Sequence, residues 1–277
     1  MSLEIIDWDS FLEAPSQNDP LFGLSAMTVG VFDGVHLGHK LLIEMIVKRG
    51  PNPTVITFRE NPKKVVSPGA YEGDITSIRQ KLELFEGLGV SRVVLIDFSV
   101  KFSKLNGWEF FEFLESRGVA FLAIGSNFRC GFQQKTDAYF ILEMNKRRGI
   151  PTELVEPVTY RNGPDPAFAV SSSRIRSAIC SGDLALARAL MGRNFEVDLR
   201  DAGQRSTGLR SAGLQTEEKV FDLSSVQRIS PKSGQYPVLV HPGSRSCRAE
   251  VRDGKVFLPV RDPVGDYNIE SIEFLGE

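Results

Sequence analysis

The chain has few cysteines and almost no net charge. Its 277 residues include three cysteines, Cys130, Cys180 and Cys247, which lie far apart. Neither a disulfide framework nor a CxxC metal site is therefore expected, and we expect the thiols to be reduced. The formal net charge of −2 and a pI near 6.0 argue against a general nucleic-acid-binding protein. Any attraction for phosphate groups must therefore be built locally, at one site.

Long apolar runs and a targeting signal are also missing. No stretch of the sequence approaches the roughly 18 to 20 continuous apolar residues that span a bilayer. The start of the chain carries acidic residues where a secretory signal has basic ones, and no apolar run follows it. We therefore expect a cytoplasmic protein that binds neither membranes nor nucleic acid. The sequence does not indicate its oligomeric state.

The composition and the order of the apolar runs favour an α/β fold. Apolar residues make up 42% of the chain and charged residues 25%, the balance of an ordinary globular protein. Short apolar runs at 27–32, 53–58, 92–98 and 119–125 alternate with helical patterns such as 39–50. Strands that alternate with helices in this way predict a mainly parallel sheet with helices on both faces.

The texture of the sequence changes near residue 195. Residues 200–215 are polar and glycine-rich, and short β-type segments follow with no convincing helix between them. This pattern predicts a small antiparallel, barrel-like β domain. We therefore predict a Rossmann-like α/β domain at residues 1–194 and a β domain at residues 195–277.

A distinctive motif, TVGVFDGVHLGH, follows the first predicted strand at residues 28–39. Its histidines, His36 and His39, are two of the three in the chain, and both fall at the start of a predicted helix. Glycines let the backbone approach a ligand closely, and helix N-termini at the carboxyl ends of parallel strands attract anions. The turn therefore predicts a phosphate site. It is neither a P-loop nor GxGxxG, and it lacks further ligands for zinc; a pair of surface or capping histidines is the structural alternative.

A second motif of the same kind, AVSSSRIR, occupies residues 169–176. Ser172, Ser173 and the first backbone N–H groups of a helix could chelate phosphate oxygens, while Arg176 adds fixed positive charge. Taken alone, the motif also fits a helix cap followed by solvated arginines, because serine is a preferred N-cap residue. The two motifs are expected at the same edge of the sheet, which makes the pair more specific than either one.

The two motifs resemble the HxGH and SSTxxR pair of the HxGH-type nucleotidyltransferases. Within that group, the chain most resembles the bacterial FAD synthetase (riboflavin kinase/FMN adenylyltransferase) family. Three further segments, TFRENP at 57–62, TSIRQKLELFEGLGV at 76–90 and GSNFRCGFQQKTD at 125–137, are similar to segments of that family and occur in the same order. The resemblance covers roughly residues 25 to 195.

The resemblance implies transfer of the adenylyl group of ATP to FMN, giving FAD and pyrophosphate. Mg²⁺ would accompany ATP, held mainly by phosphates, with no dedicated metal site in the protein. His36 and His39 would donate hydrogen bonds to phosphates at the reacting centre, and Arg176, Ser172 and Ser173 would grip the departing phosphates. The other expected binding residues are Gly30, Phe32, Asp33 and Gly38, which would shape the adenosine and phosphate site, and Phe58, Asn127 and Phe128, which would face the flavin. Core packing is the alternative role for the last two phenylalanines.

The sequence departs from the family at several positions. Asn61 stands where many relatives have histidine, and Ser173 replaces a threonine but keeps the hydroxyl. The GFPTAN signature of the riboflavin kinase module is not found at 204–214, whereas 231–240 resembles a strand of that module. We therefore predict a β domain without kinase activity. Alternatives left open are the intact bifunctional enzyme, an HxGH nucleotidyltransferase with another acceptor, and a catalytically silent flavin- or nucleotide-binding protein.

Overall fold

The computed structural model describes most of the chain as two compact units. The described residues are 2–13, 23–202, 204–211, 214–260 and 268–276. The N-terminal unit comprises Met1–Tyr71 and Lys81–Ala169, and the C-terminal unit comprises Glu72–Gln80 and Val170–Glu277. The predicted boundary between residues 194 and 195 stays a prediction, because it separates functional modules, whereas the two units are defined by contacts between residues.

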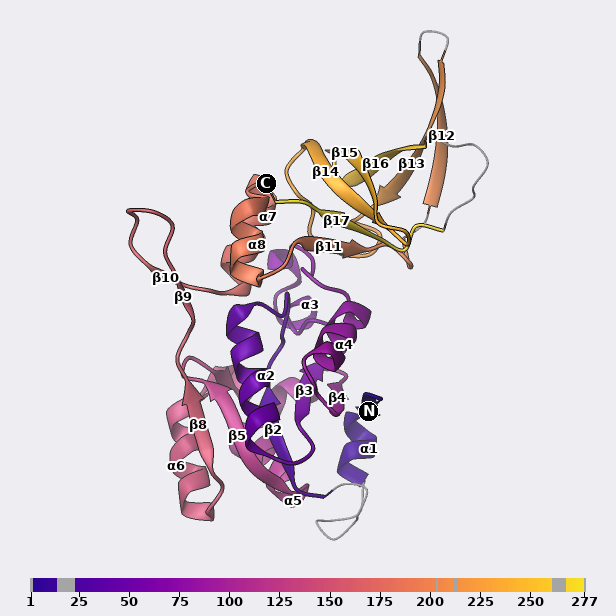
Figure 1. Cartoon of the computed structure of the whole chain (residues 1–277). Helices are drawn as coiled ribbons and strands as arrows, with labels where there is room; N and C mark the ends of the chain where they lie inside the picture. The colour runs from indigo at the N-terminus through magenta and orange to yellow at the C-terminus, as the bar shows by residue number, and fades with distance from the viewer. Residues whose placement is uncertain (1, 14–22, 203, 212–213, 261–267, 277) are drawn as a thin grey trace. The chain divides into compact units, whose positions relative to one another are not determined.

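The N-terminal unit is built on a six-stranded parallel sheet with the strand order β1-β4-β3-β2-β5-β8 (Figure 1). The strands are β1 (Glu4–Asp7), β2 (Ser25–Val29), β3 (Thr54–Phe58), β4 (Arg92–Ile96), β5 (Val119–Gly125) and β8 (Thr152–Val155). All five residues of β2 are buried, as expected for a central strand of a parallel sheet covered on both faces. The predicted Rossmann-like fold is confirmed.

Helices cover both faces of this sheet (Figure 1). They are α1 (Trp8–Glu13), α2 (Leu37–Arg49), α4 (Ile78–Gly87), α5 (Gly107–Ser116) and α6 (Ala138–Arg148). The single-turn helix α3 (Lys63–Val66) follows β3 and has no buried residue. One core cluster joins apolar side chains of α1, α5 and α6 to those of β2, β3, β4 and β5. Ile43 and Ile46 of α2 and Phe85 of α4 are buried outside that cluster. The apolar spacing of each helix therefore sets which side of it faces the sheet.

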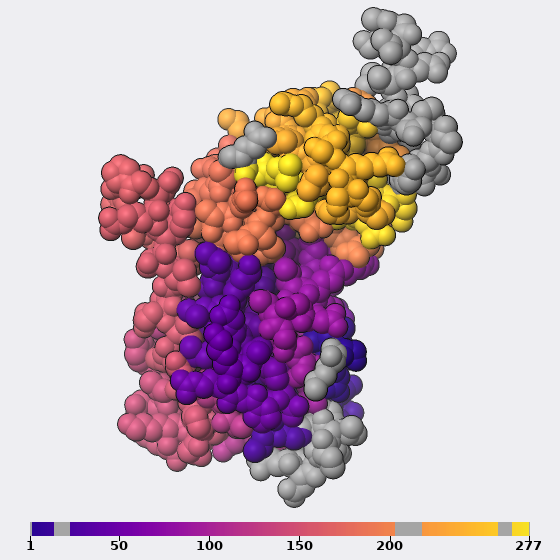
Figure 2. All heavy atoms as spheres, in the orientation of Figure 1, coloured from indigo at the N-terminus to yellow at the C-terminus, as the bar shows by residue number. Residues whose placement is uncertain are grey.

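Two short pairs of strands complete the N-terminal unit. The strands β6 (Arg129–Cys130) and β7 (Thr136–Asp137) pair just before α6. The strands β9 (Thr159–Tyr160) and β10 (Phe168–Ala169) form a hairpin whose connecting residues, 161–167, are exposed. In the space-filling view the tip of this hairpin stands out as a knob (Figure 2).

The C-terminal unit contains two helices and a seven-stranded antiparallel sheet. The helices are α7 (Ser172–Ser181) and α8 (Leu184–Met191). The strand order is β11-β17-β14-β15-β16-β13-β12. The strands are β11 (Phe195–Asp198), β12 (Gln204–Ser211), β13 (Leu214–Asp222), β14 (Gly234–His241), β15 (Arg245–Arg252), β16 (Lys255–Val260) and β17 (Ser271–Phe274). This sheet confirms the predicted antiparallel β domain.

None of the described helices is both long and apolar enough to cross a membrane.

Candidate functional site

The turn that follows β2 is shaped by two close contacts. The amide of Gly30 donates a hydrogen bond to the carbonyl of Ile56, 3.1 Å away, and so continues the pairing with β3. Phe32 has a φ of 51°, which ends the strand, and its buried ring lies against Gly30. A Cβ on Gly30 would lie 3.2 Å from that ring, so a larger residue there would push the ring away. The conformation of the turn thus depends on Gly30 and Phe32 together.

The two histidines stack on each other at the start of α2. Their ring centroids are 3.6 Å apart and the ring planes differ by 18°. His36 is the N-cap residue of the helix, and its Nδ1 accepts a hydrogen bond from the backbone amide of His39 at 3.4 Å. Because Nδ1 is the acceptor, the proton of a neutral His36 is assigned to Nε2. The structure therefore brings His36 and His39 together as a pair.

The residues around the pair hold the two imidazoles in place. The ring of Phe32 meets His39 edge to face at 5.1 Å, and His36 is buried. A Cβ on Gly38 would lie 3.3 Å from Cε1 of His36, so glycine leaves the room that the imidazole occupies. Asp33 is also buried in this turn, with 4% of its surface exposed. All the residues predicted from the first motif thus belong to one tightly packed turn.

Lys81 was not predicted from the sequence as a site residue. This lysine of α4 is only 6% exposed, and its Nζ donates hydrogen bonds to the carbonyls of Phe58, at 3.1 Å, and Val31, at 3.4 Å. The hydroxyl of Thr57 donates to the same Val31 carbonyl. Lys81 thus connects the turn at residues 30–39, called the histidine turn below, to the end of β3. Its signal in the sequence is its place four residues before Phe85, which puts a lysine in the buried stripe of the helix.

The residues predicted to face the flavin follow the two neighbours of β2. Phe58 ends β3, and Asn127 and Phe128 follow β5, so the parallel register places all three at the carboxyl edge of the sheet. The sheet order reverses direction between β2 and β5, the kind of point where α/β proteins bind ligands.

Phe58 and Phe128 are both half-buried and pack against the core cluster, whereas Asn127 is exposed. The ring of Phe58 also packs edge to face on Phe98, with the centroids 5.6 Å apart. Part of each phenylalanine side chain therefore packs on the core, and the rest of each side chain is exposed.

The second motif lies in the C-terminal unit, at the start of α7. Ser171 is the N-cap residue, and its side chain accepts a hydrogen bond from the amide of Arg174. Ser172 and Ser173 follow in the first turn. Arg174 is exposed, but Arg176 is only 7% exposed, and its Nε donates to the carbonyl of Gly73 at 3.2 Å. Arg176 is therefore not the solvated arginine that the helix-cap alternative requires.

The two motifs lie in different units, and the structure describes each unit by itself. The prediction that the histidine turn and SSSRIR act on one nucleotide therefore remains a prediction.

Among the described residues, no group of three or more His, Cys, Asp or Glu side chains could hold a metal ion. None of the three cysteines, all of which the structure describes, forms a disulfide bond, and burial raises the pKa of the Cys130 thiol to about 12. Cys130 is therefore a protonated thiol at neutral pH and a poor nucleophile.

Comparison with known proteins gives one family. The model of the FAD synthetase family matches residues 22–173. The bifunctional riboflavin kinase/FMN adenylyltransferase of Pseudomonas fluorescens is 29% identical over 86% of this chain and 79% of its own length. The protein of the same name from Escherichia coli (strain K12) is 27% identical over 77% of this chain and 67% of its own length.

The fold is similar to that of a solved structure, the macrolide-efflux protein from Streptococcus pneumoniae. The TM-score is 0.73 at 23% sequence identity, over 99% of this chain and 89% of that one. At this identity the likeness supports the fold alone.

Proposed function

The chain belongs to the FAD synthetase family, and we propose that it transfers the adenylyl group of ATP to FMN, giving FAD and pyrophosphate. The observation that carries the proposal is the stacked pair of His36 and His39 at the N-terminus of α2. The pair lies at the carboxyl end of β2, where the sheet order reverses. A helix N-terminus and two adjacent imidazoles at such a point suit a phosphate chain.

Adenylyl transfer needs positioning and charge neutralisation more than covalent help from the protein. The phosphate of FMN attacks the α-phosphorus of ATP, a new P–O bond forms, and the bond to pyrophosphate breaks. Nε2 of His36, which carries the proton in the neutral ring, donates a hydrogen bond to a phosphate oxygen near the reacting centre. His39, stacked on it, is the second donor.

The remaining predicted residues take supporting roles in this proposal. Arg176 holds the departing β- and γ-phosphates of ATP, with Ser172 and Ser173 beside it in the sequence. The adenosine and phosphate site is shaped by Gly30, Phe32, Asp33 and Gly38 of the histidine turn. The flavin ring packs on Phe58 and Phe128, near Asn127.

Mg²⁺ enters this proposal as the partner of ATP. As the resemblance to the family implies, the ion would be coordinated mainly by phosphate oxygens and water. Bound there, it would neutralise phosphate charge. We also propose a cytoplasmic location, which the three widely spaced cysteines favour.

The proposal assigns no kinase activity to the β domain. Its support is the sequence at 204–214, which lacks the GFPTAN signature of the riboflavin kinase module. A separate reaction that phosphorylates riboflavin must then supply the FMN.

Release of pyrophosphate with a panel of acceptors tests the proposed function. The purified full chain would be mixed with ATP, Mg²⁺ and, in turn, FMN, phosphopantetheine, nicotinamide mononucleotide or riboflavin. We expect pyrophosphate and FAD with FMN only. Release with another phosphate would assign a different acceptor, and no release with any acceptor would indicate a catalytically silent binding protein.

A further inference from the structure

The segment Glu72–Gln80 leaves the unit to which its sequence neighbours belong. Residues before and after it lie in the N-terminal unit, whereas the segment itself packs in the C-terminal unit. Within it, Ile75, Thr76 and Ser77 are each no more than 5% exposed. A buried segment with this path is held by specific contacts, and the C-terminal unit supplies them from two places.

The first place is the connection between β13 and β14. The amide of Asp74 donates to the carbonyl of Gln227 at 3.0 Å, and the amide of Ile229 donates to the carbonyl of Asp74 at 3.1 Å. The side chains of Asp74 and Arg228 form an ion pair at 3.8 Å, and both are less than 15% exposed. The backbone at Asp74 is therefore fixed to the β domain on both of its polar sides.

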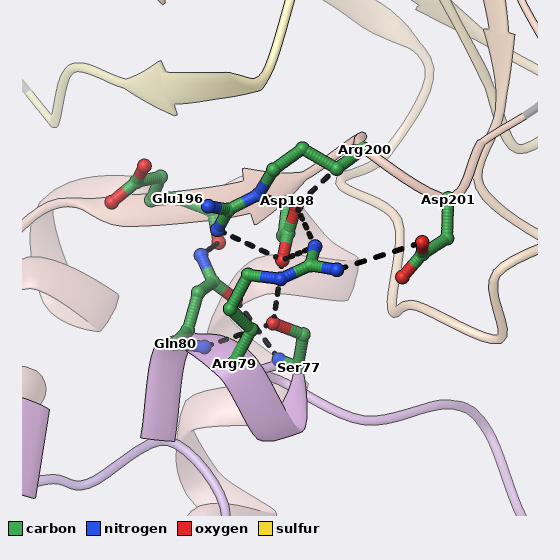
Figure 3. Close-up of polar contacts among 7 residues, drawn as sticks. All are labelled: Ser77, Arg79, Gln80, Glu196, Asp198, Arg200 and Asp201. Atoms are coloured by element: carbon green, nitrogen blue, oxygen red, sulfur yellow. Dashed lines mark hydrogen bonds and ion pairs between the residues drawn. The ribbon is translucent and has the colours of Figure 1, made fainter. Parts of the chain in front are cut away.

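The second place is β11, where three side chains converge on the carboxylate of Asp198 (Figure 3). Ser77 Oγ donates to Asp198 at 2.8 Å, and Arg79 and Arg200 donate to the same carboxylate at 3.2 Å and 2.9 Å. Gln80 Nε2 donates to the carbonyl of Glu196 at 3.0 Å. These contacts anchor the C-terminal end of the segment, so both of its ends are attached to the β domain.

Gly73 links this anchored segment to Arg176. Its carbonyl accepts the hydrogen bond from Nε of Arg176 at 3.2 Å, which restrains the orientation of the guanidinium. Gly73 has a φ of 107°, and a Cβ at this position would lie 2.8 Å from the backbone carbon of Arg228. Only glycine satisfies both the conformation and the close approach.

We infer that the β domain contributes to adenylyl transfer by positioning Arg176 through the segment Glu72–Gln80. Gly73 and Arg228 are positioning residues, and Arg176 is the residue that touches the phosphates of ATP. This inference rests on the function proposed above for Arg176. Positioning of Arg176 would be a function for a β domain that lacks the kinase signature.

A double-mutant cycle in the full chain tests the inference. Gly73→Ala should lower the kcat of FAD formation at least tenfold, since a misplaced group commonly costs that much. In the background of Arg176→Met, the same Gly73→Ala change should lower kcat less than twofold further, because the two changes remove one function. The matched control is Gly69→Ala, where a Cβ meets no atom within 4 Å. It should keep the kcat of the unchanged protein.

The affinity for FMN separates positioning from a loss of folding. Quenching of flavin fluorescence should give a Kd for FMN within twofold of the unchanged protein for Gly73→Ala, because Arg176 acts on ATP. If that variant fails to fold, Arg228→Met replaces it in the cycle, with the same expected non-additivity.

Two results would overturn one claim each. Independent, multiplicative losses from Gly73→Ala and Arg176→Met would refute the positioning role and leave the proposed function intact. Unchanged turnover in Arg176→Met alone would instead refute the role of Arg176 in the proposed function.

Discussion

His39 is the side chain whose removal should affect the chemistry most. It stacks on His36 and is held by the edge of Phe32. His39→Ala should lower FAD formation about a hundredfold, as loss of a preorganised hydrogen-bond donor typically does. Steady-state assays with ATP and FMN would measure it. The matched control is His241→Ala, the third histidine, which pairs with Glu273 in the β domain and should keep near-normal turnover. Equal activity of the two variants would contradict the role of the pair.

Lys81 should contribute to stability through the two carbonyls it holds. Lys81→Met keeps the length of the side chain but removes the donor to Phe58 and Val31. Loss of a buried hydrogen-bonded donor should lower the free energy of unfolding by about 1–3 kcal/mol. Urea unfolding would measure this, with the exposed Lys104→Met as the control. A loss no greater than that of the control would show that the carbonyls find other donors.

The structural role of a residue can be predicted from the sequence when its partners are close to it in the chain. Asp137 is the N-cap residue of α6, and its side chain accepts a hydrogen bond from the amide of Phe140. The capping pattern is local, so the sequence contains all of it. Lys81 was missed because the ammonium is held by backbone carbonyls of β3 and the histidine turn, and no local pattern encodes a partner 50 residues away.

The attachment of the segment Glu72–Gln80 to β11 should depend on pH. Burial alone would raise the pKa of Asp198, but hydrogen bonds from Arg200 and Ser77 together with the charge of Arg200 outweigh it and hold this pKa below its usual value. A depressed pKa in the folded state stabilises the protein above the pKa of the unfolded chain, near 3.8. This stability is lost as the pH falls through the folded pKa.

Asp198→Asn should therefore be destabilised by about 2 kcal/mol at neutral pH, where hydrogen bonds to a charged group are lost. The difference from the unchanged protein should shrink below about pH 4. Thermal unfolding at several pH values would show it, with the exposed Asp253→Asn as the control. A difference that stays constant down to pH 2 would show that the carboxylate charge is not its source.

Strands were predicted correctly from the sequence where runs of apolar residues mark them. The predicted run at 53–58 matches β3, Thr54–Phe58, and the run at 119–125 matches β5. The predicted strand at 27–32 ends at Val29, because the positive φ of Phe32 belongs to the turn. The strand β12 was not predicted, since its sequence, QRSTGLRS, is polar and contains a glycine. The strand β12 pairs with β13 through backbone hydrogen bonds, and a pattern of side chains does not predict such a pairing.

The division of the whole chain was only partly visible in the sequence. The change from α/β to β texture is real, but α7 and α8 join the same compact unit as the β domain. The sequence also gave no sign that Glu72–Gln80 joins that unit, because nine residues within an α/β pattern leave no change in composition. Contacts such as that of Ser77 with Asp198, 121 positions apart, exist only once the chain has folded.

Following the phosphorus atoms of ATP tests the central claim most directly. The full chain would be incubated with FMN or riboflavin and with ATP labelled at either the α- or the γ-phosphate, and the products would be separated. We predict that the α-label enters FAD when FMN is supplied, that the γ-label is found only in pyrophosphate, and that riboflavin stays unlabelled. Transfer of the γ-label to riboflavin, or an α-label that never reaches FAD, would contradict the account.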